Sequence, residues 1–172
     1  MPADGCRPRN VRPRRPHRKG ALRSAIRRGM AIVIRGLVEE RESAAVARVS
    51  HGGREFVALV DGSASTLTKA LGQSLIVEIS FDRVVSWRLL PDFDDEDSCI
   101  MASDDAAEVL VVRGRVHSVL RVDEVTEVLD VYLRTGPQFL AVDSTELGGS
   151  SPAIGSGIEL LLEGMCFYPT RT

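Results

Sequence analysis

Residues 30–38 read MAIVIRGLV, and residues 108–116 read EVLVVRGRV. In both stretches apolar residues alternate with other side chains, and an Arg-Gly pair stands at the same place, ending at Gly36 in the first and at Gly114 in the second. Alternation with a period of two among β-branched and other apolar residues predicts a strand that buries one face. The two clearest strands of the chain are therefore copies of one pattern.

Two further blocks recur in the same order. Residues 56–59, FVAL, recur as FLAV at residues 139–142. The third block, Leu75, Val77 and Ile79, recurs as Ile158, Leu160 and Leu162, and Pro91 and Pro169 close the two copies. Three blocks in one order indicate an ancient duplication, and they predict two units, residues 30–91 and residues 108–172.

The first unit contains five short apolar runs separated by turn residues, with a helical excursion between the third and the fourth run, and the second unit follows the same course with a Gly/Ser loop in place of the excursion. In the first unit we expect strands at 31–38, 44–49, 55–60, 75–81 and 84–90 and a short helix at 65–71; in the second we expect strands at 108–120, 126–134, 139–142 and 158–168. This number and order of strands resembles the OB-type barrel, the oligonucleotide and oligosaccharide binding architecture. SH3-like barrels would give nearly the same pattern. The predicted fold is mainly β, with two tandem five-stranded OB-like β-barrels.

The first 29 residues form a basic tail rich in Arg and Pro. They contain ten basic residues and one acidic residue, Asp4. Such a segment buries too little apolar surface to offset the entropy of ordering, so we expect it to be disordered. A second interpretation is that translation starts at Met30. The 20 arginines against two lysines indicate a GC-rich, bacterial source.

The remaining residues are acidic, with twelve basic and 23 acidic residues between positions 30 and 172. Many of the carboxylates gather in residues 92–107, DFDDEDSCIMASDDAA, which we interpret as an extended, solvated linker. Its spacing lacks the central glycine and distal glutamate of an EF-hand loop, so we predict no metal site there.

Cysteine usage and hydropathy favour a cytoplasmic protein. The three cysteines, Cys6, Cys99 and Cys166, form no CxxC pair, which argues against a disulfide framework or a zinc site. We expect Cys166 in the core and Cys99 at the surface. No apolar run approaches the roughly 20 residues of a membrane-spanning helix, so no membrane partner is predicted.

No set of catalytic residues can be recognised, and we predict no enzyme and no cofactor. The histidines, His17, His51 and His117, are not brought together by any motif, and His51 is interpreted as a turn residue. Asp61 and Asp143 both end the third strand of their units, where an aspartate usually caps a turn. No phosphate-cradling glycine loop or nucleophile–base pair is present.

Aromatic residues could provide a stacking surface for single-stranded nucleic acid. Phe56 and Phe139 occupy matching positions and are expected in the core, which leaves Trp87 and Tyr132 as stacking candidates. The predicted nucleic-acid contacts are these two rings and the nearby or tail arginines, namely Arg7, Arg9, Arg12, Arg14, Arg15, Arg18, Arg83, Arg88 and Arg134.

Two functions follow from these observations. The first is a non-catalytic module that binds a protein partner, which we expect to be basic, through strand edges or loops; toxin immunity proteins that neutralise a basic partner would fit the charge. The alternative is single-stranded nucleic-acid binding by the barrels with help from the arginine-rich tail.

Overall fold

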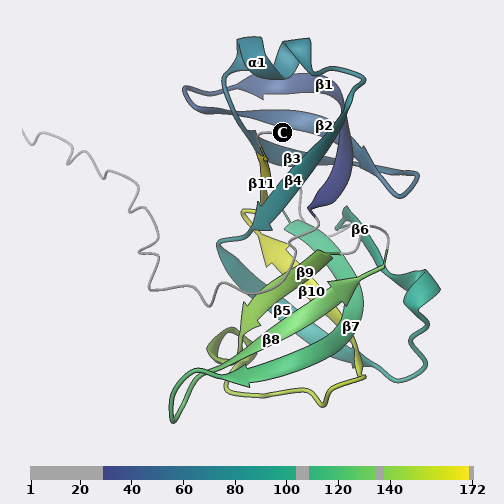
Figure 1. Ribbon diagram of the computed structural model, residues 1–172, viewed down its shortest axis with the longest axis vertical. Coiled ribbons are helices and arrows are strands. Elements are labelled where there is room, and N and C mark those ends of the chain that lie inside the picture. The colour runs from purple at the N-terminus through teal and green to yellow at the C-terminus, as the bar shows by residue number, and fades with distance from the viewer. Residues whose placement is uncertain (1–28, 104–108, 135–137, 171–172) are drawn as a thin grey trace, which may run out of the picture.

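The computed structural model describes residues 29–103, 109–134 and 138–170. Most regular structure in these residues is β, with one α-helix and two short 3-10 helices, so the prediction of a mainly β protein is confirmed. The strands form two units, one above the other in Figure 1. The basic tail, residues 1–28, and its arginines lie outside the described residues. No helix in the described ranges is long and apolar enough to cross a membrane.

The first unit is a closed barrel with the strand order β1-β2-β3-β11-β4. Its strands are β1 (Met30–Glu40), β2 (Ala44–His51), β3 (Arg54–Asp61), β4 (Ser74–Ser80) and β11 (Cys166–Pro169). The predicted helical excursion is present as α1 (Ala64–Lys69), which begins where the Ser63 side chain accepts a hydrogen bond from the backbone of Thr66 at 3.3 Å. The barrel confirms the expected closed, five-stranded architecture.

The second unit is a six-stranded sheet with the order β5-β10-β7-β8-β9, in which β6 also pairs with β7. Its strands are β5 (Arg83–Leu90), β6 (Cys99–Ala102), β7 (Val109–Arg121), β8 (Glu127–Leu133), β9 (Gln138–Asp143) and β10 (Gly157–Glu163). The 3-10 helix η2 (Ser144–Leu147) follows β9, and its Glu146 carboxylate accepts a hydrogen bond from the backbone of Val84 in β5.

The last strand of each half pairs with the other half. β11 lies parallel to β3 and antiparallel to β4, so the end of the chain closes the first barrel. In turn, β5 pairs antiparallel with β10 of the second sheet. The prediction that each half closes its own barrel is therefore not confirmed. The strand expected at 158–168 is interrupted at Gly164, whose φ of 69° lets the chain turn and enter the first barrel.

The acidic segment after Pro91 is not only a spacer. Residues 95–97 form the 3-10 helix η1 (Asp95–Asp97), and β6 follows it and pairs antiparallel with β7. Asp95 lies 2.6 Å from Nε of Arg115, so the segment is held against the second sheet by side chains as well as backbone. The expectation of a fully solvated linker is wrong for these residues, while residues 104–108 lie outside the described ranges.

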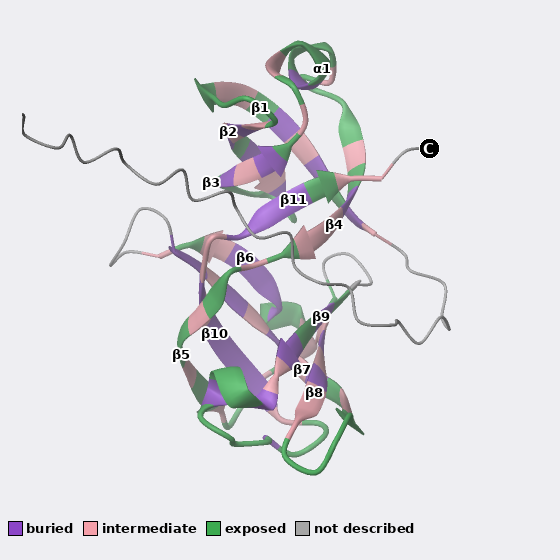
Figure 2. Ribbon diagram, turned by 90° about the vertical axis from the view of Figure 1, so that its left-hand side faces the viewer, coloured by how far each residue is buried: buried purple, intermediate pink, exposed green. Residues whose placement is uncertain are grey.

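Buried apolar residues line the inner faces of both units and form one core cluster, as Figure 2 shows along the strands. Alternation is clear in β1, where Ile32 and Ile34 are fully buried. In the second unit Gly114 lets β7 approach β8 closely, because a Cβ there would lie 2.6 Å from the backbone oxygen of Tyr132. Cys166 is buried, as expected, but so is Cys99, which was expected at the surface.

Candidate functional site

The arginines predicted to contact nucleic acid lie in ion pairs where the structure describes them. Arg83 pairs with Glu163, Arg88 with Glu159 and Arg134 with Glu96. The hydrogen bonds that Arg83 and Arg88 donate to Glu163 and Glu159 raise the pKa values of the two guanidinium groups. The predicted tail arginines, Arg7, Arg9, Arg12, Arg14, Arg15 and Arg18, lie outside the described residues.

The two predicted stacking rings lie in different environments. Trp87 of β5 is half-buried and packs against the core cluster. Tyr132 of β8 lies on the outer face of the second sheet, 5.4 Å from the ring of Phe139 and 6.3 Å from that of His117, centroid to centroid. The His117 and Phe139 rings are 5.0 Å apart. The structure thus brings Tyr132 into a three-ring cluster and leaves Trp87 outside it.

Phe139 is 47% exposed, so its expected place in the core is wrong. The alignment of FLAV with FVAL matches Phe139 to Phe56, which is buried. The buried residues of the two strands do not follow this alignment, because β3 buries Ala58 and Val60 whereas β9 buries Leu140 and Val142. Counting back from the strand-ending aspartates, Asp61 and Asp143, matches Phe139 to Val57, which is exposed. A one-residue slip in a period of two moves every side chain to the other face. Alignment on the two strand-ending aspartates therefore predicts that Phe139 is exposed.

His117 joins the cluster because β7 bulges there. The register of β7 against β8 passes from Val116 opposite Val131 to Ser118 opposite Asp130, so His117 is the extra residue. A bulge leaves its extra residue unpaired and re-aims its side chain. Ser118 donates a hydrogen bond of 2.6 Å to the Asp130 carboxylate beside it.

We call this surface the β7–β9 outer face. Three rows of cross-strand neighbours build it: Arg115, Tyr132 and Phe139, then Ser118, Asp130 and Ala141, then Leu120, Val128 and Asp143, with His117 added at the bulge. The one cation in these rows, Arg115, is paired with Asp95. Beyond the third row lies the tip of the β7–β8 hairpin, where Val122 and Val125 are exposed, the latter by 83%.

The carboxylates of the β7–β9 outer face have no cationic partner among the described residues. Asp130 accepts from Ser118, and Asp143 accepts from the backbone and hydroxyl of Thr145 at 2.8 and 2.7 Å, which is the turn cap expected for it. No ion pair in the described part of the chain neutralises either carboxylate, and Asp130 lies in the row next to the rings.

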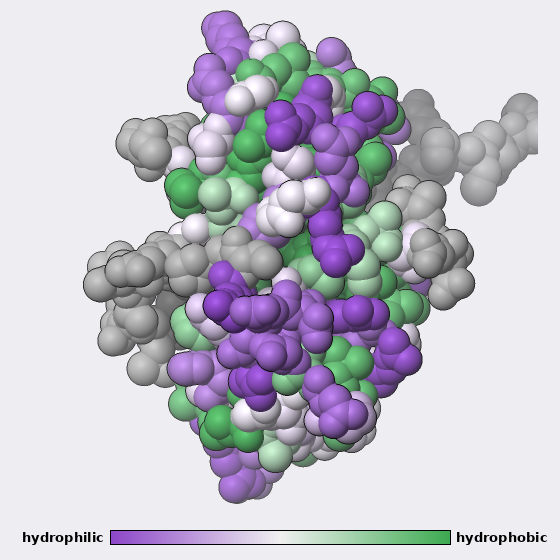
Figure 3. Space-filling view, turned by 90° about the vertical axis from the view of Figure 1, so that its right-hand side faces the viewer, coloured by the Kyte–Doolittle hydropathy of each residue, from purple (hydrophilic) through white to green (hydrophobic). Residues whose placement is uncertain are grey.

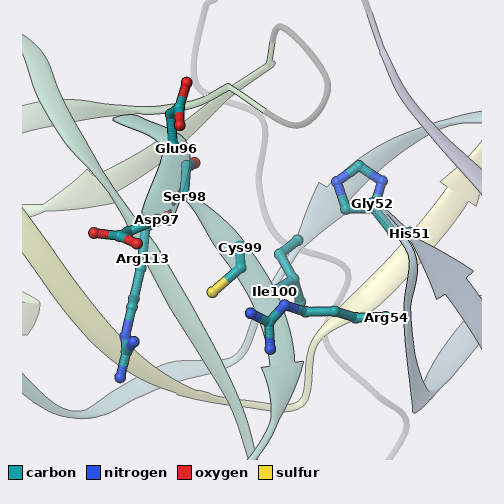
Figure 4. Close-up of a pocket in the computed structure, with 9 residues that line it drawn as sticks. All are labelled: His51, Gly52, Arg54, Glu96, Asp97, Ser98, Cys99, Ile100 and Arg113. Atoms are coloured by element: carbon teal, nitrogen blue, oxygen red, sulfur yellow. Dashed lines mark hydrogen bonds between the residues drawn. The ribbon is translucent and has the colours of Figure 1, made fainter. Parts of the chain in front are cut away.

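A second candidate site is a cavity of about 200 Å³ between the two units, which we call the junction cavity (Figure 4). Its lining comes from the β2–β3 hairpin, η1, β6 and β7 and comprises His51, Gly52, Arg54, Glu96, Asp97, Ser98, Cys99, Ile100 and Arg113. Figure 3 views the molecule from the side of η1 and shows hydrophilic residues gathered over the second unit there.

The histidine in this cavity is not the plain turn residue expected. His51 ends β2, is buried, and its Nδ1 lies 2.8 Å from the carbonyl oxygen of Ala31. Because a carbonyl only accepts, Nδ1 carries the hydrogen and the hydrogen bond fixes the ring. The ring ties the end of β2 to β1.

The Arg113 side chain of the cavity wall belongs to an ion-pair network around the buried carboxylate of Glu159. Glu159 is 7% exposed, and its two oxygens accept from Nε of Arg88 and Nε of Arg113, each at 2.7 Å. Burial works to raise the pKa of Glu159, but the hydrogen bonds from both arginines outweigh it and hold the pKa below its ordinary value. The carboxylate is therefore charged and holds Arg113 in place.

The thiol of Cys99 faces the same cavity. Burial raises its pKa, against the opposing effect of Arg54 and Arg113. A raised thiol pKa lowers the thiolate fraction that a nucleophile needs. No group of three His, Cys, Asp or Glu side chains in the described residues could hold a metal ion.

No protein-family model and no curated protein sequence matches the chain. Among solved structures, the chain is similar to the cytoplasmic molybdate-binding protein ModG in a molybdate-bound form. The identity is 16% and the TM-score 0.48, over 85% of this chain and 98% of the ModG chain.

Proposed function

We propose that the protein is a non-catalytic binding module whose β7–β9 outer face takes a basic segment of a protein partner. The observation that carries the proposal is the cluster of Tyr132, Phe139 and His117 beside the carboxylate of Asp130. Exposed aromatic rings contribute most to protein interfaces when a partner covers them. Their faces also attract cations, and a carboxylate beside them strengthens that attraction.

The extent of the face supports a protein rather than a small ligand. Exposed apolar side chains recur on this side of the sheet at Phe139, at Leu120 and at Val125 of the hairpin tip, with Ser118 and Asp130 in the row between the first two. Exposed apolar side chains grouped on one side of a soluble protein mark interaction sites. β9 also ends the sheet order, so its outer edge offers backbone groups to an extended segment.

The charge supports a basic partner. Residues 30–172 carry eleven more acidic than basic residues, and four arginines of the second sheet, Arg83, Arg88, Arg113 and Arg115, are paired with carboxylates. Such a surface accelerates association with a positive partner and repels polyanions. Neutralisation of a basic protein, as immunity proteins perform, is one function of this kind. A duplicated pair of OB-like units is part of the proposal and is supported by the same element order in both halves.

Single-stranded nucleic acid is the second candidate, and the half-buried ring of Tyr132 in the cluster favours it. Bases stack on such rings, but phosphates also need free cations nearby. Arg83, Arg88 and Arg134 are already paired with carboxylates. The arginine-rich tail would have to supply the charge, and binding would then fall steeply with salt and with deletion of residues 1–29.

Selection from a random peptide display library tests the first candidate without knowledge of the partner. We expect the full chain to enrich peptides rich in Lys and Arg, and the double variant Phe139→Ser, Asp130→Asn to lose that enrichment. Val57→Ser, which alters an exposed apolar residue of the first barrel, is the matched control. Equal enrichment by all three proteins, or enrichment without a basic bias, would exclude the proposed face.

Fluorescence anisotropy with labelled single-stranded DNA and RNA tests the second candidate. The full chain and residues 30–172 are compared at low and at physiological salt. Binding by residues 30–172 at physiological salt, lost in Tyr132→Ala, would favour nucleic acid over protein. No binding at physiological salt leaves the basic protein partner as the function to pursue.

A further inference from the structure

The junction cavity is large enough for a small ligand. Its volume is about 200 Å³, whereas one water occupies about 30 Å³ in the liquid. Its walls come from both units, with the β2–β3 hairpin of the first barrel on one side and η1, β6 and β7 on the other (Figure 4). A ligand here would contact both units at once.

Two arginines line this cavity, and Arg113 is paired with Glu159. Arg54 has no carboxylate within ion-pair distance among the described residues. Its Nη1 makes a long contact of 3.9 Å with the sulfur of Met101. In Figure 4 its guanidinium extends toward β6 on the side of Cys99, while the carboxylates of Glu96 and Asp97 turn away from it. A guanidinium so placed keeps most of its hydrogen-bond donors available to a ligand.

The local charge is positive in an otherwise acidic part of the chain. The lining itself holds two guanidinium groups and two carboxylates, and the ion-pair partners of these groups add two guanidinium groups and one carboxylate, which leaves one positive charge in all. These groups are Arg54, Arg88, Arg113, Arg134, Glu96, Asp97 and Glu159. An anion would therefore be favoured here although the whole unit repels anions.

We propose that the junction cavity binds a small tetrahedral oxyanion of the phosphate or sulfate class, with the guanidinium of Arg54 as its main ligand. The planar fork of an arginine fits two oxygens of such an ion. The Glu159 network holds Arg113 at the opposite wall, and the His51–Ala31 hydrogen bond holds the hairpin that carries Arg54. The anion would be either a free ion or the phosphoryl group of a larger molecule.

Thermal unfolding and calorimetric titration of the full chain test the proposal. The probes are inorganic phosphate, sulfate and O-phosphoserine at constant ionic strength, with chloride as the background anion. We expect at least one probe to raise Tm by roughly 3–6 °C at about ten times its Kd. Binding of O-phosphoserine alone would identify a phosphoryl group as the ligand, and binding of the inorganic ions would identify a free oxyanion.

Two variants locate the site. Arg54→Gln is expected to weaken binding at least tenfold, because it removes a charged donor pair. Arg48→Gln is the control: Arg48 is an exposed arginine of β2 that does not line the cavity. An anion bound in the junction cavity should also slow the alkylation of Cys99 by a neutral maleimide. We expect this protection in the wild type and in Arg48→Gln, but not in Arg54→Gln. No binding of any probe, or equal binding by the two variants, would overturn the proposal.

Discussion

Phe167, close to the end of the chain, lies opposite Val60 of β3 in a parallel pair, and its ring is 6.0 Å from that of Phe56. Phe167 is fully buried in the first barrel, although it belongs to the second half of the sequence. The closure of the first barrel therefore depends on a strand that the chain makes last.

Phe167→Ala should destabilise the whole protein. Removal of a fully buried ring costs about 3–5 kcal/mol through lost burial and the cavity left behind. Tyr168→Ala is the control, since Tyr168 is 42% exposed and should cost much less. Denaturant unfolding followed by circular dichroism measures both, and similar losses would contradict the role assigned to β11.

Residues 30–91 expressed alone should not fold cooperatively. This fragment lacks β11, and its β5 has lost β10, the strand it pairs with in the full chain. We expect poorly dispersed amide resonances and a broad thermal transition. A well-dispersed spectrum would show that β5 can replace β11 within its own half, which would contradict an obligatory exchange.

Gly114→Ala and Gly36→Ala compare the two matching glycines of the repeated pattern. A Cβ at Gly114 would lie 2.6 Å from the backbone oxygen of Tyr132, whereas a Cβ at Gly36 would meet nothing within 4 Å. We expect a loss of about 1–3 kcal/mol for Gly114→Ala and a change of at most about 1 kcal/mol for Gly36→Ala. Equal shifts in Tm would argue against the close approach of β7 and β8.

Glu159→Gln should make the free energy of unfolding depend less on pH below neutrality. Since the folded-state pKa of Glu159 lies below its ordinary value, its ion pairs stabilise the fold above the unfolded-state pKa of about 4.3 and are lost as pH falls below it. With Arg88 largely exposed, we expect a loss of about 1–3 kcal/mol at pH 7. The free energy of unfolding between pH 3 and 7 measures this, and parallel profiles for variant and wild type would contradict it.

The sequence predicts only part of the candidate site. Tyr132 was recognised as a ring near the surface, but Phe139 was assigned to the core because two similar tetrapeptides were aligned one residue out of register. The third ring, His117, depends on a bulge in the pairing of β7 with β8, and pairing has no signature within β7 itself. The junction cavity joins Arg54 to Cys99 and Arg113 from distant parts of the chain, so no local motif could predict it.

The sequence by itself determined the local elements: alternating apolar residues specify strands, glycines specify turns, and the same order of elements appears in both halves. Only the tertiary structure decided which strands pair. A strand pattern records which face is buried but not which backbone edge it meets, so it predicted neither the pairing of β5 with β10 nor the entry of β11 into the first barrel. Their exchange, the packing of β6 against β7 and the cavity between the units arise from contacts between distant residues, whose energies no local pattern contains.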